Sequence, residues 1–279
     1  MPTIRETLQQ ARTRLAHLPT PRLDAEWLLC HVLGVSQSYL IAHSTEPLPE
    51  QHFNAFMALV ERRTAGEPVA YLMSEVGFYG RTFHITSDVL IPRPETEHLI
   101  EAALGFAQRW SQPVIADIGT GSGAIAVTLA AELPSAQVYA TDISADALTV
   151  ARQNATSNSV NVTFKQGNLA QPLLPALAGQ VHLLAANLPY IASDDVPTLA
   201  VSQYEPQLAL DGGPDGLDLV RELLAQVPLL CTPDAAILLE IGTTQGPATR
   251  QLARDILGDI WATIKKDYAG HDRLVVIER

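Results

Sequence analysis

The stretch DIGTGSGA, residues 117–124, places three glycines between an apolar run and a helical run. Gly119, Gly121 and Gly123 allow a tight turn and let a ligand approach backbone N–H groups at a helix N-terminus. Asp142 ends the next apolar run, at a distance where a carboxylate accepts hydrogen bonds from both hydroxyls of a ribose. The pattern predicts a site for an adenosine-containing ligand.

The kind of adenosine ligand depends on Asp117. Gly119, Gly121 and Ala124 also satisfy the dinucleotide pattern G-x-G-x-x-G/A, so the glycines alone do not decide. The order acid-x-G-x-G matches the first motif of S-adenosylmethionine methyltransferases. An acid at the entrance of the loop also suits a cationic methionine better than an anionic diphosphate. We therefore predict S-adenosylmethionine as the cofactor.

A second motif, NLPY at residues 187–190, follows the apolar run VHLLAA. Asn187 could accept one N–H of a planar NH2 group through its side-chain oxygen, and the main-chain carbonyl of Leu188 or Pro189 could accept the other. Such a pair would hold the nitrogen in line with the methyl–sulfur bond, at the ~3–3.5 Å of a near-attack geometry. Tyr190 would lie against the planar group and stabilise the positive charge that develops on nitrogen. The motif predicts methylation of a planar nitrogen.

The elements that must position both motifs alternate between strand-like and helical runs. In chain order they are VIADI, GAIAVTLAAEL, AQVYATD, ADALTVARQNA, VTF, VHLLAAN, GLDLVRELLAQV, AAILLEIG, the helical residues 247–257, IWATIKK and RLVVIE. Such alternation predicts an α/β fold, a mostly parallel sheet with helices on both faces. Ligands bind such sheets at the carboxyl ends of the strands, where both motifs fall.

The first 70 or so residues predict helices. Thr20 and Pro21 form a helix start with proline at the first helical position, and Gly34 suits the helix end. A second helix before Gly66 is indicated by the spacing of Phe53, Phe56, Met57 and Val60.

Residues 76–91 change to short β-like runs, VGFYGRTFHI and then DVLI, with Gly80 at a turn. We interpret this segment as a hairpin between two domains. The expected organisation is a helical domain over residues 1–73, a β-hairpin linker over residues 74–92 and a catalytic domain over residues 93–279.

The charge distribution bears on partners. The first 66 residues carry as many basic as acidic side chains, so the whole net charge of -12 belongs to the remainder. An acidic surface repels a phosphate backbone, and no basic stripe with interleaved aromatics is present. We expect no bulk nucleic-acid binding.

Other residue types point to a reduced, metal-free protein. Cys30 and Cys231 lie far apart in the sequence, which favours two packed thiols over a disulfide. No histidine pair has metal-ligand spacing. No run is apolar enough to cross a bilayer, and the N-terminus lacks the apolar middle of a secretory signal. We expect a cytoplasmic protein with no membrane contact and no metal site.

Several stretches resemble the peptide-chain release-factor glutamine methyltransferases, which modify the amide nitrogen of a glutamine in a Gly-Gly-Gln loop. The resemblance runs through PRLDAEWLLCHVLG, RRTAGEPVAYL, FYGRTFHITSDVLIPRPETE, DIGTGSGAIAVTLA, TDISADAL, VARQNA, YEPQLALDGGPDGLDL and KDYAGHDRLVVIE. It implies a Rossmann-like, seven-stranded class I methyltransferase domain, preceded by a small all-helical domain and a β-hairpin linker. The helical domain is expected to help bind a protein substrate, which the resemblance implies is a release factor.

The family's site residues carry over position by position. Asp142 would bind the ribose, and Asn168 and Leu169 would border the adenine. The loop around the methionine part would consist of Gly119, Thr120, Gly121, Ser122 and Gly123. The substrate amide would be held by Asn187, Leu188, Pro189 and Tyr190, of which Asn187, Pro189 and Tyr190 are the expected catalytic residues and Asn187 also borders the cofactor. The segment Arg93, Pro94 and Glu95 resembles a loop near the mouth of the site and Glu205 belongs to another, without an assigned chemical role.

Three positions depart from the family pattern. Leu188 stands where the family usually has the first proline of Asn-Pro-Pro-Tyr, which removes rigidity but keeps the carbonyl that the site needs. Asn168 stands at a usual aspartate, and its amide can still bridge to an adenine amino group. His182 replaces an acidic residue and is expected to be a packed or edge histidine.

Alternatives remain open from the sequence. Asn-Leu-Pro-Tyr is typical of ribosomal RNA adenine dimethyltransferases, so an RNA adenine N6-methyltransferase is the alternative that the acidic charge argues against. A glutamine methyltransferase acting on a ribosomal protein is separated poorly by sequence. A non-catalytic binding module and a nicotinamide dehydrogenase are less favoured, because Asn187 and Tyr190 are both retained and no hydride-transfer acid or base lies near the loop.

Overall fold

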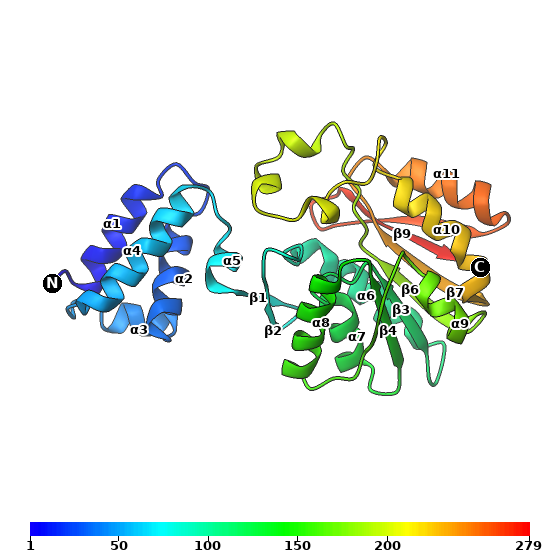
Figure 1. The fold of residues 1–279 in the computed structure, drawn as a ribbon, viewed down its shortest axis with the longest axis horizontal. Coiled ribbons are helices and arrows are strands. Elements are labelled where there is room, and N and C mark those ends of the chain that lie inside the picture. Colours follow the sequence, from blue (N-terminus) through cyan, green and yellow to red (C-terminus); the bar gives the residue numbers. More distant parts are fainter. The chain divides into compact units, whose positions relative to one another are not determined.

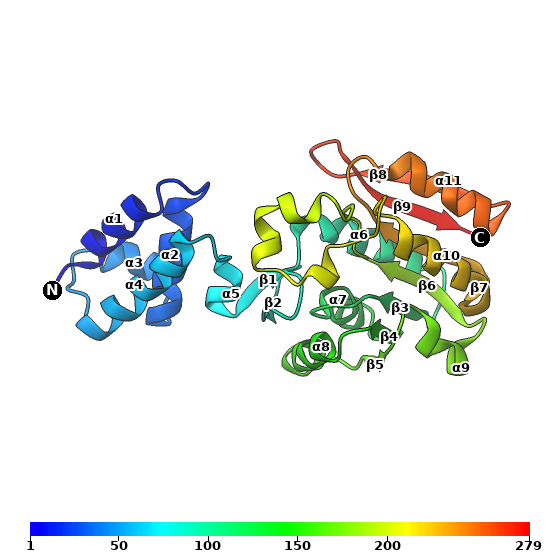
Figure 2. The same ribbon diagram turned by 45° about the horizontal axis from the view of Figure 1, so that its top comes forward.

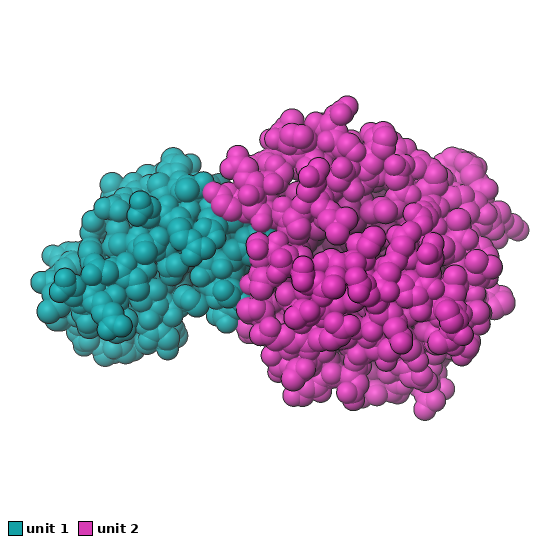
Figure 3. Space-filling view, viewed as in Figure 1, with its two compact units in different colours: residues 1–75 teal, residues 76–279 magenta.

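The computed structural model describes residues 1–279 and divides them into two compact units, Met1–Glu75 and Val76–Arg279 (Figure 3). The hairpin therefore belongs to the second unit. The predicted division into a helical domain (1–73), a linker (74–92) and a catalytic domain (93–279) stays a prediction.

The first unit is all-helical, as expected. Its helices are α1 (Ile4–Arg14), α2 (Pro21–Leu33), α3 (Gln37–Ala42), α4 (Glu50–Thr64) and α5 (Val69–Met73). The predicted ends of α2 are confirmed, with Thr20 before it and Gly34 after it in the left-handed conformation. The Thr20 hydroxyl does not cap the helix but donates to Asp24 (2.7 Å), whose other oxygen accepts from Arg63 of α4 (2.7 Å). This buried ion pair joins the two helices beside an apolar core that includes Leu28, Leu29, Phe56 and Val60.

The second unit begins with the expected hairpin, β1 (Glu75–Phe78) and β2 (Arg81–His84), with its turn at Tyr79 and Gly80. The expectation of a further strand over residues 88–91 is wrong, because this run is turn and coil. Val89 and Ile91 are nevertheless buried. The run is apolar because these side chains are buried within the second unit. No neighbouring strand pairs with it.

The main sheet has seven strands in the order β5-β4-β3-β6-β7-β9-β8, as the family resemblance implied. The strands are β3 (Val114–Ile118), β4 (Gln137–Asp142), β5 (Thr163–Gln166), β6 (Val181–Ala186), β7 (Cys231–Glu240), β8 (Trp261–Lys266) and β9 (Asp272–Glu278). All neighbouring pairs are parallel except those that β9 makes with β7 and β8. Chain order reverses between β3 and β6, and a reversal of this kind leaves a crevice at the carboxyl ends of the two strands.

Two groups of helices cover this sheet. In one group α6 (Glu97–Ala107) contacts α7 (Ala124–Glu132), which contacts α8 (Ala145–Ser157). In the other, α10 (Asp218–Leu230) contacts both α9 (Leu174–Leu177) and α11 (Gly246–Leu257). Figures 1 and 2 show the two groups on opposite sides of the strands. Strand β3 is buried along its whole length, as a strand with both faces covered must be.

Smaller expectations are also settled by the fold. His182 of β6 accepts a hydrogen bond from the Val114 amide at Nδ1 (3.0 Å) and lies against Trp110, so it is a packed histidine as predicted.

Both cysteines are free thiols, and burial raises the pKa of Cys231 to about 12. None of the helices has both the length and the apolar character that crossing a bilayer requires.

Candidate active site

A cavity of about 320 Å³ opens in the second unit at the carboxyl ends of the parallel strands. Residues that follow β3, β4, β5 and β6 contribute to its wall, and three other segments complete it. The lining residues discussed below are Arg93, Thr96, Gly119, Thr120, Gly121, Ser122, Asp142, Asn168, Leu169, Asn187, Leu188 and Pro189. The position is the one that the strand-order reversal predicts.

The glycine loop is held to β4 by hydrogen bonds between backbone groups. The Gly119 and Thr120 amides both donate to the Thr141 carbonyl at the end of β4 (2.9 Å each). Gly121 adopts a positive φ of 53° at the cavity wall, and a Cβ placed there would meet no atom within 4 Å. A side chain at this position would therefore strain the backbone and project into open space. Gly123 does not line the cavity but immediately precedes α7, and a Cβ placed on it would lie 3.1 Å from that of Ala151.

Asp117 lies beneath the loop rather than on the cavity wall. Its carboxylate is fully buried, and Oδ2 accepts from the Thr120 hydroxyl (2.6 Å) and the Ala126 amide (3.1 Å). Oδ1 has no partner within the protein. Burial raises the pKa of Asp117 to about 7, and the two hydrogen bonds offset part of the rise. The acid that distinguished the motif thus fixes the loop and the first turn of α7.

Asp142 connects the end of β4 to the loop. Its Oδ2 accepts from the Gly121 amide (2.8 Å), and its Oδ1 accepts from the Ser144 amide (2.9 Å). A carboxylate has about four lone-pair sites, so it can still accept from a diol in the cavity. Burial raises the pKa of Asp142, and the hydrogen bonds from the backbone counter it.

Asn168 and Leu169 follow β5 at the other side of this wall. The Asn168 Nδ2 donates to Glu222 of α10 (2.5 Å). The Glu222 carboxylate therefore binds the NH2 group of the Asn168 side chain. The side-chain oxygen of Asn168 remains as a free acceptor. Leu169 is buried and adopts a positive φ of 45°, which is uncommon for a residue with a side chain.

The two sequence motifs touch each other. Leu188 is buried, and its Cδ2 would lie only 2.8 Å from a Cβ placed on Gly119. The residue that departs from the family pattern therefore packs against the first glycine of the loop. Asn187, next to it, donates from Nδ2 to the hydroxyl of Thr96 (3.2 Å).

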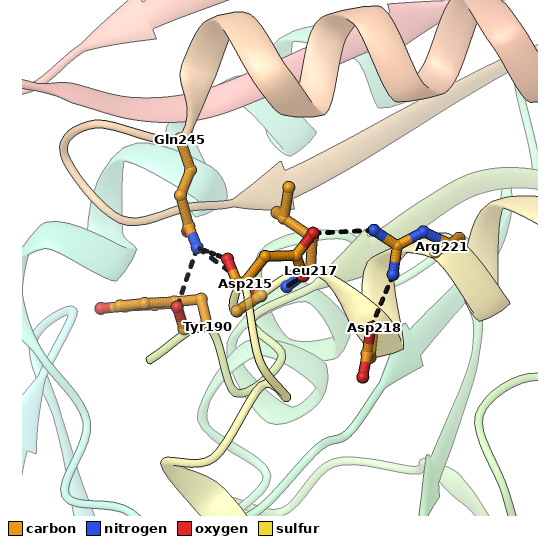
Figure 4. Close-up of polar contacts among 7 residues, drawn as sticks. Tyr190, Asp215, Leu217, Asp218, Arg221 and Gln245 are labelled. Atoms are coloured by element: carbon orange, nitrogen blue, oxygen red, sulfur yellow. Dashed lines mark hydrogen bonds and ion pairs between the residues drawn. The ribbon is translucent and has the colours of Figure 1, made fainter. Parts of the chain in front are cut away.

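Tyr190 is not among the residues that line the cavity. Burial raises the pKa of its phenol, and the charge of Glu240 raises it further. The charges of Arg273 and Arg93 lower this pKa. Its main-chain carbonyl accepts from the side chain of Gln245 (2.8 Å), which reaches toward it in Figure 4. The predicted contact of its ring with a substrate stays a prediction.

The glycine-rich segment 212–216 packs on the end of the same motif. A Cβ on Gly212 would lie 2.6 Å from the Pro189 carbonyl oxygen, and one on Gly216 would clash with the Tyr190 carbonyl oxygen. Asp215 within this segment and Asp218 just after it are paired with Arg221 (2.9 and 2.6 Å), as Figure 4 shows. Gly212 and Gly216 of LDGGPDGL are thus required for close packing against residues 189 and 190.

Arg93 and Glu205 have no predicted chemical role, and they form an ion pair with an Nη2–Oε2 distance of 2.5 Å. Glu205 is buried and Arg93 reaches the cavity wall, so the pair joins two segments 112 residues apart. Burial raises the pKa of Glu205, and Arg93 opposes this effect.

Sequence reasoning missed four residues that hold these parts in place. Asn154, which is fully buried, donates to the Ser122 carbonyl (2.8 Å) and to that of His84 (2.9 Å), and so joins the glycine loop to the hairpin. The other missed residues are Thr96, Glu222 and Gln245. Asn154 and Thr96 each carried a signal, since VARQNA and FYGRTFHITSDVLIPRPETE are part of the family resemblance.

Comparisons with known proteins agree with this geometry. Residues 6–73 match the family described as PrmC N-terminal domain, and residues 115–204 match a family described as methyltransferase domain. A release factor glutamine methyltransferase of Moorella thermoacetica is 42% identical, with 99% of each chain covered. One of Bacillus subtilis is 37% identical, with 99% of this chain and 97% of the relative covered.

The fold is also found among solved structures. A methyltransferase from Pyrococcus furiosus superposes with a TM-score of 0.50 at 18% identity, covering 80% of this chain and 96% of that chain. At this identity the likeness concerns the fold alone.

Proposed function

Because this chain belongs to the release factor glutamine methyltransferases, we propose that it transfers a methyl group from S-adenosylmethionine to a glutamine side-chain amide in the Gly-Gly-Gln loop of a release factor. The observation that carries the proposal is that the glycine loop and Asn187 line one cavity and meet through Gly119 and Leu188. A methyl donor and its acceptor must share such a space.

The residues on one side of the cavity fit S-adenosylmethionine. Asp142 has acceptor capacity left for the ribose hydroxyls, and the open space at Gly121 admits a ligand against the backbone. Asn168 offers a carbonyl oxygen to an adenine amino group, because Glu222 occupies its nitrogen. When bound, the cofactor supplies an electrophilic methyl group on a sulfonium.

The other side fits a primary amide. Asn187 uses its nitrogen on Thr96, so its oxygen is the atom available to accept one substrate N–H. Gly212 covers the Pro189 carbonyl, which makes the Leu188 carbonyl the better acceptor for the second N–H. Two acceptors orient the nitrogen lone pair toward the methyl group, so positioning supplies much of the rate.

The transfer itself requires no strong base in the protein. The cofactor that Asp142 and the glycine loop would hold supplies the methyl group, so a nitrogen–methyl bond would form as a sulfur–methyl bond breaks. The nitrogen then carries positive charge and releases its proton to solvent. Asn187 and the Leu188 carbonyl act by holding the nitrogen while this charge develops.

The substrate class rests on the family and on charge. All of the net charge of -12 belongs to residues after 66, which contain the cavity. This charge disfavours RNA and is compatible with a protein loop. The helical unit, which matches the PrmC N-terminal domain, is the part that we propose binds the body of the release factor. Translation termination places the protein in the cytoplasm.

The test is methyl transfer from labelled S-adenosylmethionine to purified acceptors. We expect label in a release factor and none in its Gln→Ala loop variant. Parallel reactions contain a ribosomal protein and ribosomal RNA. Label confined to either of those acceptors would assign the enzyme to that substrate class and reject the proposal.

A further inference from the structure

The carboxamide of Asn187 is bound at one end only. Its Nδ2 donates to the Thr96 hydroxyl, and Thr96 is itself 3% exposed. A hydroxyl has a single hydrogen and can serve as donor or acceptor to Asn187. The direction of this hydrogen bond decides whether the oxygen or the nitrogen of Asn187 faces the cavity.

Glu240 is the group that can fix this direction. It ends β7, next to β6, which leads into Asn187, and it is 3% exposed. The Thr96 side chain lowers the pKa of this carboxyl by hydrogen bonding, against the rise that burial causes. Glu240 Oε2 is buried and has no partner within the protein, so this oxygen is available to accept the Thr96 hydrogen.

We propose that Glu240, through the Thr96 hydroxyl, is a positioning residue that turns the amide oxygen of Asn187 toward the substrate nitrogen. When Glu240 is ionised it accepts the Thr96 hydrogen, which leaves the Thr96 oxygen to accept from Asn187. The Asn187 oxygen then points away from Thr96 and can accept a substrate N–H. The inference rests on the proposed function and adds two residues to its site.

Protonation of Glu240 reverses the relay. A neutral carboxyl can donate to Thr96, whose hydrogen then goes to the Asn187 oxygen. The amide turns its NH2 toward the substrate NH2, and two donors face each other. Turnover should therefore require ionised Glu240.

The surroundings place this ionisation in an accessible range. Burial raises the pKa of Glu240 to about 7, opposed by the Thr96 hydrogen bond, Arg273 and Arg93 and assisted by Glu95. Burial raises the pKa of the Tyr190 phenol, and the charge of Glu240 raises it further. Turnover should consequently fall as the pH drops through about 7.

The experiment compares Thr96→Val with Thr96→Ser in the full chain. Valine keeps the volume and removes the hydroxyl, whereas serine keeps the hydroxyl. Thr249→Val is the matched control, because Thr249 is fully buried in α11, its hydroxyl has no partner and it does not line the cavity. We expect kcat on a release factor to fall about 10- to 100-fold in Thr96→Val and to be largely retained in Thr96→Ser.

Two further readouts separate positioning from folding. Affinity for S-adenosylhomocysteine, measured by calorimetry, should stay within about twofold of wild type in all three variants, because none changes the cofactor side. The fall in kcat below pH 7 should disappear in Thr96→Val and in Glu240→Gln, since neither retains the titrating relay.

The possible outcomes distinguish failure of the proposed function from failure of the relay. A wild-type enzyme that transfers no methyl group to the release factor would overturn the proposed function and this inference with it. If the wild type is active but Thr96→Val turns over as fast as Thr249→Val, or keeps the same loss below pH 7, only the relay is refuted.

Discussion

The two sides of the cavity are built in different ways. On the glycine-loop side the contacts are close in sequence and mostly involve the backbone: Thr120 bonds Asp117 three residues away, and the Gly121 amide bonds Asp142 21 residues away. On the Asn187 side they join distant side chains, with Asn187 and Thr96 91 residues apart and Arg93 and Glu205 112 residues apart.

We relate this difference in construction to the molecule that each side binds, the cofactor on one side and the substrate amide on the other. A cofactor that is the same in every reaction can be bound by a loop whose shape follows from its glycines. A substrate nitrogen must instead be oriented within a few tenths of an ångström, and a side chain is held that firmly only when other side chains pack and bond around it. Changes on the Asn187 side should therefore affect rate, and changes on the loop side should affect cofactor binding and stability.

The largest effect is expected at Asn187. Removing the carboxamide in Asn187→Ala should lower kcat by about 10³-fold or more, because the substrate nitrogen loses its orienting acceptor. Calorimetric affinity for S-adenosylhomocysteine should remain within a few-fold of wild type. Equal losses of turnover and of cofactor affinity would remove the distinction between the two sides.

The Arg93–Glu205 pair offers a matched test of the long-range contacts. Glu205 is buried and the Arg93 side chain is 34% exposed, so the two truncations are unequal. Arg93→Ala leaves a buried carboxylate without its partner and should destabilise the protein by about 2–4 kcal/mol at pH 8, whereas Glu205→Gln should cost about 1 kcal/mol.

Denaturant unfolding of the two variants at pH 8 and at pH 5 measures this asymmetry. Burial raises the pKa of Glu205, and without Arg93 it should rise further, so lowering the pH from 8 to 5 favours the neutral carboxyl. The penalty of Arg93→Ala should then shrink at pH 5. Equal penalties in both variants at both pH values would show that the pair carries no buried charge.

Much of the loop side could be predicted from the sequence. The alternation of strands and helices, the ends of α2 and the placement of Gly119 to Ser122 and Asp142 at one cavity all follow from local patterns. The run 88–91 was misread as a strand because a short buried apolar run has the same composition whether it pairs or only packs.

The Asn187 side could be predicted only in part. The motif itself was visible, but the hydrogen bonds that Thr96 and Gln245 make to it were not, because nothing near either residue in the sequence indicates a partner 91 or 55 residues away. Asp117 was recognised as part of the motif, yet its expected role at the entrance of the loop differs from its observed place under it. Local patterns thus give the residues of a site more readily than the contacts that orient them.

Asp117 allows a test of the loop side through stability. Its pKa is raised by burial to about 7, so between pH 4 and pH 7 the folded protein holds a proton that the unfolded chain releases. The free energy of unfolding contributed by this group therefore falls as the pH rises through that window. In Asp117→Asn the fall between pH 5 and pH 8 should be smaller by about 1–3 kcal/mol.

Thr120→Val makes the opposite change. It removes the hydroxyl that bonds the Asp117 carboxylate (2.6 Å), so the pKa should rise further and the loss of stability should extend to higher pH. Denaturant titrations at a series of pH values give both slopes. Parallel slopes in wild type and Asp117→Asn would mean that Asp117 is ionised throughout this range.

The smallest effect tests whether the loop side also contains one oriented side chain. Glu222 binds the Asn168 nitrogen (2.5 Å), which should leave only the oxygen for an adenine amino group. In Glu222→Ala the amide can rotate, and affinity for S-adenosylhomocysteine should fall about 3- to 10-fold. The preference over S-inosylhomocysteine, whose base carries oxygen in place of the amino group, should fall as well.

Asn168→Asp supplies the control, because an aspartate offers acceptors only and needs no partner to orient it. In that background Glu222→Ala should cost nothing or raise affinity, since it removes a neighbouring like charge. Calorimetry on wild type, the two single variants and the double variant gives the coupling free energy between positions 168 and 222 in cofactor-product binding. This coupling shows whether Glu222 acts by orienting Asn168. A cost of Glu222→Ala that is equal in both backgrounds would mean that Glu222 acts on the cavity without orienting Asn168, and the loop side would then depend on backbone alone.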